Sequence, residues 1–114
     1  MKSKRIKGYK VFNNDWRCNG FQFKVGKTYK HKGSISICQS GFHFCKELKD
    51  CFNYYDLIQW NKFAEVEGWG ESETHNEDSK IVVENIKIIK ELSFEDVGQV
   101  LKSYGVNRSD PFTP

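Results

Sequence analysis

One segment, residues 41–55, constrains the fold most, because its hydrophobic period changes within a few residues. Phe42 and Phe44 alternate with small or polar residues, as in a strand that buries one face. The next residues form an apolar stripe at helical spacing, made of Leu48, Cys51, Phe52 and Tyr55. The segment therefore predicts a short strand that passes directly into a helix over residues 46–55. Side chains left over at the junction predict a ligand pocket lined by His43, Asn53 and Tyr54.

Length and composition predict a single domain. The chain has 114 residues, and its 15% of aromatic residues supply large buried area for one core. We expect a basic arm over residues 1–7, one domain over 8–105 and a mobile tail over 106–114. No apolar run approaches the roughly 18 residues of a spanning helix, and no apolar signal core follows the basic start. These features predict a cytoplasmic protein, inside a host cell, with no membrane partner.

The remaining pattern predicts an α+β domain with a mostly antiparallel, curved sheet and two helices. Expected strands cover residues 8–13, 21–25 with an extension to 28–30, 63–67 and 80–92, and residues 35–38 are expected to form a short strand or an extended loop. Glycines at 68–70 predict a bulge, the polar stretch 71–78 predicts an exposed loop, and the pattern of 80–92 shifts register near Glu84. Ser93 and Asp96 form a capping-box pattern that begins a helix ending near Gly105.

Charge and cysteine usage narrow the function classes. The net charge is only +3, which argues against nucleic acid, although lysines and aromatic residues interleave over 23–32. The alternative interpretation of that stretch is a solvated strand pair with edge lysines. Four cysteines include no C-x-x-C pair, and Cys45 and Cys51 fit core positions. We therefore expect reduced cysteines, no metal and no cofactor, whereas exposed edge strands leave a homodimer open.

The strand–helix segment resembles the second signature segment of the ADP-ribosyltransferase family, in its diphtheria-toxin-like branch. Its pattern is glycine, apolar, aromatic, apolar, small, and then a helix ending in Asn-Tyr. The layout of residues 8–92 is also similar to the small rifampin ADP-ribosyltransferases. The resemblance implies an ADP-ribosyltransferase-like fold and a nicotinamide pocket. His43 falls at the first stacking tyrosine, Tyr54 at the second, and Cys51 at the serine that bonds the nicotinamide amide.

This sequence departs from that family where catalysis needs specific groups. The strand at 8–12 has no His-Gly pair or arginine at its end. The catalytic glutamate of the late strand has no clear counterpart, although three residues are candidates: Glu65, Glu67 and Glu84. Without a carboxylate to stabilise the positively charged transition state, we expect a pocket without turnover.

The whole chain also resembles a family of small phage and prophage proteins, through its patterns at Gly20–Tyr29 and Gly41–Cys45. Together the two resemblances imply a protein that binds a nucleotide or NAD-derived ligand, such as NAD, ADP-ribose or a cyclic nucleotide signal, and sequesters a host immune signal. His43 and Tyr54 would stack on the base, Asn53 would read an amide or phosphate, and Arg17, with Lys10 or Lys80, would neutralise phosphate.

Two alternatives from other classes remain. One is an active mono-ADP-ribosyltransferase, which would require a glutamate such as Glu65 or Glu67 to support NAD cleavage. The other is a direct protein inhibitor of a host nuclease or CRISPR complex, which would make a host defence protein the partner and would use the lysine-rich face or the acidic loop.

Overall fold

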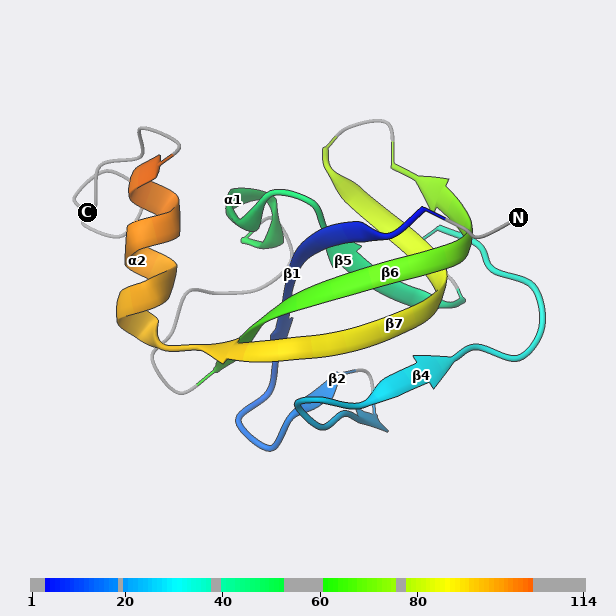
Figure 1. Cartoon of the computed structure of the whole chain (residues 1–114), viewed down its shortest axis with the longest axis horizontal. Helices are drawn as coiled ribbons and strands as arrows, with labels where there is room; N and C mark the ends of the chain where they lie inside the picture. Colours follow the sequence, from blue (N-terminus) through cyan, green and yellow to red (C-terminus); the bar gives the residue numbers. More distant parts are fainter. Residues whose placement is uncertain (1–3, 19, 38–39, 53–60, 76–77, 104–114) are drawn as a thin grey trace.

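The computed structural model describes residues 4–18, 20–37, 40–52, 61–75 and 78–103 (Figure 1). It contains the expected α+β domain, with a mostly antiparallel sheet and two helices. The elements follow in the order β1 (Ile6–Phe12), β2 (Arg17–Cys18), β3 (Phe21–Gln22), β4 (Thr28–Lys30), β5 (Phe42–Cys45), α1 (Leu48–Cys51), β6 (Lys62–Thr74), β7 (Lys80–Leu92) and α2 (Phe94–Ser103).

The main sheet curves until it closes on itself. β7 pairs with β5, β5 with β1, β1 with β6, and β6 again with β7, each time antiparallel. The two long strands β6 and β7 run side by side across the molecule, and β4 continues the sheet along β7 (Figure 1). The short β2–β3 hairpin forms a separate sheet. Closure leaves few free strand edges and creates an enclosed interior.

Two apolar clusters stabilise the fold on opposite faces of the strands. Phe12, Phe44 and Val66 belong to the cluster inside the barrel, as do Ile81 and Ile88. The outer cluster joins both helices to the sheet through Val11, Cys45, Leu48, Cys51, Phe63, Leu92, Val97 and Leu101. The alternation expected for residues 42–45 is thus confirmed, because Phe42 and Phe44 face the interior and Cys45 faces the helices.

The start of α2 has the predicted capping box. The Ser93 hydroxyl accepts the Asp96 backbone N–H at 3.0 Å, and the Asp96 carboxylate accepts the Ser93 N–H at 3.0 Å. Both bonds satisfy backbone donors that a helix start otherwise leaves unpaired. Within the described ranges, no helix has the length and apolar character needed to cross a bilayer.

Several element boundaries differ from the sequence prediction. β1 begins at Ile6, inside the segment expected as a basic arm, and Arg5 pairs with Glu67 and lies over the Trp69 ring, so residues 5–7 contact the domain. Residues 35–38 form no strand in their described part, which contributes only the bridge between Ser36 and Ser40. The helix predicted over 46–55 is described only as Leu48–Cys51, and the tail 104–114 lies outside the described residues.

The largest difference concerns residues 71–74, which continue β6 instead of forming an exposed loop. Ser72, Glu73 and Thr74 pair with the buried run 81–83 of β7, so a tertiary partner overrides their polar local preference. The glycine bulge is confirmed, since the register shifts between Trp69 and Ser72. That shift lies opposite Glu84, where the sequence predicted an irregularity, and β7 remains one strand through it.

Two glycines allow the barrel to close around the Phe44 ring. A Cβ at Gly8 would overlap Phe44 Cδ2 and would lie 2.5 Å from the Cys45 carbonyl oxygen. A Cβ at Gly68 would lie 2.7 Å from Phe44 Cε1. The ring therefore occupies the space that side chains on β1 and β6 would otherwise need, and the strands approach more closely than any larger residue permits.

We expect Gly8→Ala to lower the free energy of unfolding by about 1–3 kcal/mol, the range for overpacked sites. The matched control is Gly98→Ala in α2, where a Cβ meets no atom within 4 Å. Because alanine is the better helix former, the control should raise the free energy by about 0.5–1 kcal/mol. Urea denaturation measures both values, and equal effects of the two substitutions would contradict the close approach at Gly8.

Candidate functional site

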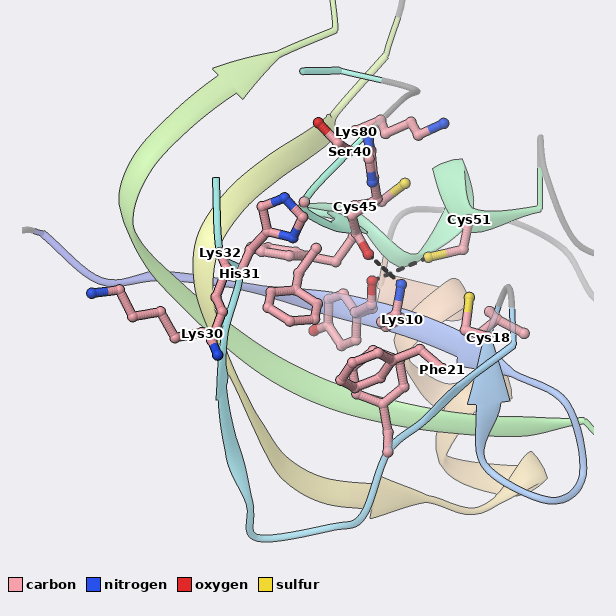
Figure 2. A pocket seen from close by; sticks show the side chains of 17 residues that line it. Lys10, Cys18, Phe21, Lys30, His31, Lys32, Ser40, Cys45, Cys51 and Lys80 are labelled. Carbon is pink, nitrogen blue, oxygen red and sulfur yellow. Dashed lines mark hydrogen bonds between the residues drawn. The ribbon is translucent and has the colours of Figure 1, made fainter. Parts of the chain in front are cut away.

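The barrel is incomplete between β1 and β5. These strands share one residue pair, Tyr9 with Cys45, whereas β1 and β6 pair along the whole of β1. Beyond that pair the Lys10 side chain enters the gap and donates a hydrogen bond from Nζ to the His43 carbonyl oxygen (Figure 2). A side chain thus replaces backbone pairing, and we call this stretch the β1–β5 seam.

A cleft of about 650 Å³ opens at the seam, a volume in the range of small-molecule sites. Its lining combines positive charge with aromatic rings, and no carboxylate occurs among the described residues that form it. The basic side chains are Lys10, Lys30, His31, Lys32, His43 and Lys80. The rings belong to Tyr9, Phe21, Phe23, Phe42 and Phe44, and smaller surfaces come from Val11, Cys18, Ser40, Gly41, Cys45 and Cys51.

Lys10 is the most unusual group in this lining. It is 6% exposed, and its Nζ lies 5.6 Å from the centre of the Phe23 ring and 5.9 Å from that of Phe12. The carbonyl of His43 and these ring faces offset part of the cost of burial. Among the described residues, no carboxylate pairs with it. A buried ammonium in such surroundings favours an anion brought by a ligand.

Three basic residues follow one another at the cleft on the side of β4: Lys30, His31 and Lys32. In Figure 2, Lys10 lies near the centre of the lining, whereas Lys30 lies at one side of it and Lys80 at another. Lys30 is 71% exposed in its side chain and reaches Glu84 only at 4.0 Å. A weak, exposed contact of that kind leaves the lysine charge available to a ligand.

Phe21 supplies an exposed aromatic surface to the cleft. It is 44% exposed, and the β2–β3 hairpin carries it. Its ring centre lies 4.7 Å from that of Phe23, 5.4 Å from Tyr29 and 5.6 Å from Phe42. Three neighbouring rings thus support it from behind, and the remaining surface of the ring is free for a flat ligand to cover.

His43 lines the cleft, as the sequence predicted. Burial, and then the charges of Lys10 and Lys80, lower its pKa to about 4. At neutral pH the imidazole is therefore uncharged, which suits it to contact with a flat ring and to hydrogen bonding. Hydrogen bonds with the backbone of Gly41 and Ser36 oppose the shift but do not cancel it.

Cys51 also lines the cleft, but its thiol already has a partner. Its Sγ donates to the Tyr9 carbonyl oxygen at 3.4 Å (Figure 2). A hydrogen bond with the Cys45 side chain, and then burial, raise the pKa of the Cys51 thiol well above its usual range. The group is thus a neutral thiol rather than a nucleophile, and its engaged hydrogen leaves the sulfur as a weak acceptor toward a ligand.

Arg17 does not line the cleft, so the structure does not bring the expected phosphate clamp to the site. Its Nε donates to Gln22 Oε1 at 3.1 Å and lies 3.7 Å from Asp15 Oδ2, with 57% of the side chain exposed. These contacts link the two strands of the β2–β3 hairpin, a structural role that the local sequence did not indicate. Asn53 and Tyr54 lie outside the described residues.

Sequence reasoning missed several lining residues, above all Phe21, Lys30, His31 and Lys32. Their signal was present in the interleaved basic and aromatic residues of 23–32, which suggested nucleic acid or a solvated strand. The candidate catalytic glutamates do not reach the lining. Glu65 pairs with Lys90 and Glu67 with Arg5, both outside the lining, whereas Glu84 makes the 4.0 Å contact with Lys30. Over the described ranges, no three His, Cys, Asp or Glu side chains group as metal ligands do.

Fold and site together define a small α+β barrel protein with a basic, aromatic cleft at an open strand seam. The chain belongs to the DUF7666 family, a domain of unknown function whose model matches residues 6–100. That match begins with β1 and ends inside α2, so it includes every strand of the barrel. Neither the curated proteins nor the solved structures contain a match to this chain.

The lowered pKa of His43 predicts a pH-dependent stability. As pH falls from 6.5 to about 4, the unfolded state takes up a proton that folded His43 resists, so the free energy of unfolding should fall across this window. His43→Gln should have a shallower slope there and a parallel slope from pH 7 to 8. Urea denaturation at each pH tests this, and equal slopes below pH 6.5 would contradict a disfavoured imidazolium.

Proposed function

We propose that this protein binds a nucleotide-type ligand in the β1–β5 cleft and holds it without turnover. The observation that carries the proposal is the described part of the lining, in which four lysines and five aromatic rings occur and no carboxylate is found. Phosphate groups match the lysines, and a base matches the rings. An acidic or purely apolar ligand would use only one half of this lining.

The finer form of the proposal builds on the two family resemblances. In this form, the β5–α1 unit corresponds to the strand–helix unit of an ADP-ribosyltransferase-like fold. The ligand is then NAD-derived or a cyclic nucleotide signal. The protein acts in the cytoplasm as a phage-type binding protein that sequesters a host immune signal. Support comes from the place of His43 and Cys51 in the cleft lining, at the junction where the resemblance puts the ligand.

Binding without turnover is favoured over transferase activity by the lining itself. Glycosyl transfer from NAD develops positive charge on the ribose, which a carboxylate would have to stabilise. The described lining supplies cations instead, and these would oppose such a charge. A sequestering protein needs slow release rather than chemistry, and a cleft built on rigid strands suits that need.

Thermal shift against NAD, ADP-ribose, cyclic ADP-ribose, cyclic dinucleotides and AMP tests the proposal. A ligand at a hundred times its Kd should stabilise the protein by about 2.7 kcal/mol. The ligand should then be recovered intact from the denatured complex. No stabilisation by any of these compounds would reject the proposal, and release of nicotinamide from NAD would establish the transferase alternative.

The paired variant Lys30→Gln/Lys32→Gln should weaken binding of the active compound about tenfold, equivalent to about 1.4 kcal/mol. Its control, Lys24→Gln/Lys27→Gln, removes the same charge from residues outside the lining and should change Kd by less than about twofold. Isothermal titration at low and high salt measures both. Equal losses in the two variants would show that net charge, rather than this cleft, attracts the ligand.

A further inference from the structure

The cleft lining has a buried basic part and an exposed aromatic part. Lys10 is 6% exposed and Phe21 is 44% exposed, and we call their parts of the lining the covered end and the mouth. Both residues line the same cleft (Figure 2). A ligand that contacts both must therefore present different chemistry at its two ends.

The covered end offers hydrogen-bond donors and a positive charge to an anion. A lysine ammonium has three donor hydrogens, and the His43 carbonyl accepts one of them. The rings of Phe12 and Phe23 face the charge but accept no conventional hydrogen bond. Among the described residues no other group accepts from Lys10, which leaves two donor positions for ligand oxygens. A phosphate with nearly two negative charges supplies both acceptors and a counter-charge.

The mouth suits a flat ring. Phe21 is held by ring contacts to Phe23, Tyr29 and Phe42, so little side-chain freedom is lost when a base covers it. Gln22, the next residue in the hairpin, is fixed by its bonds to the carbonyls of Asp15 and Phe23. The ring is thus presented by an ordered element before any ligand arrives.

We propose, on the basis of the broad nucleotide-type function above and as an alternative to its NAD, ADP-ribose and cyclic nucleotide forms, that the ligand is a nucleoside with a terminal phosphomonoester, which enters phosphate first. Lys10 binds the phosphate at the covered end, and Phe21 stacks on the base at the mouth. A terminal phosphate fits because it is the end of the ligand, and nothing has to extend beyond it into the buried part of the lining. An internal phosphodiester carries a further group on each side of the phosphate. A volume of about 650 Å³ holds one nucleotide rather than a long chain.

The first test compares four probes on the unaltered protein by isothermal titration: AMP, adenosine, ribose 5-phosphate and 3′,5′-cyclic AMP. We expect AMP to bind at least about tenfold more tightly than each of the others, because each lacks the phosphomonoester, the base or the free phosphate end. This comparison needs no variant, so a folding defect cannot obscure it.

The second test assigns the two ends. Lys10→Met should bring the Kd of AMP close to that of adenosine, and its control Lys24→Met, outside the lining, should not. Phe21→Leu should bring the Kd of AMP close to that of ribose 5-phosphate. Its control is Val25→Ala, which alters a 37% exposed apolar side chain outside the lining. Circular dichroism confirms that each variant is folded.

The outcomes separate this inference from the proposed function. Cyclic AMP or ADP-ribose binding as tightly as AMP would overturn the terminal-phosphate inference and leave the nucleotide-type function standing. An unchanged preference for AMP over adenosine in folded Lys10→Met would likewise overturn it. Absence of binding by every nucleotide, including those of the wider panel, would reject both.

Discussion

The contact between the Lys10 ammonium and the His43 carbonyl is the interaction on which the site depends. Backbone pairing between β1 and β5 would have closed the barrel and filled the position of the cleft. The long lysine side chain instead spans the gap, satisfies a strand carbonyl and leaves the strands apart. The barrel thus retains a closed hydrogen-bonding pattern on three sides and an opening on the fourth, and the opening has a positive charge at its buried end.

At the other end of the seam, β1 and β5 lie in close contact instead of being held apart. Gly8 permits β1 to approach Phe44 and the Cys45 carbonyl, and Tyr9 then makes the single residue pair with Cys45. One residue later, Lys10 holds the strands apart. Adjacent residues on β1 therefore set a narrow and a wide part of the seam, and the cleft opens over only a few residues of each strand.

The charge of the cleft has a thermodynamic consequence for the DUF7666 domain in this chain. Burial, and then the charges of Lys10 and Lys80, lower the pKa of His43 so that it stays neutral, and no carboxylate in the described lining offsets the lysine charges. A bound anion would offset these charges, so electrostatic attraction would contribute to its binding. This arrangement is costly for a purely structural element, and it supports a role in anion recognition.

Local sequence determined the strand at Phe42–Cys45, the helix start at Ser93 and the glycine bulge at 68–70, because each follows from side-chain period, capping or backbone freedom within a few residues. It also pointed to His43, Lys10 and Cys51, which line the cleft. Only the tertiary structure decided that β1 and β5 part at Lys10, that Arg17 faces away, and that the residues after β4 join the lining. Those outcomes depend on which distant strands become neighbours, and residue spacing along one segment carries no information about a partner far away in the chain.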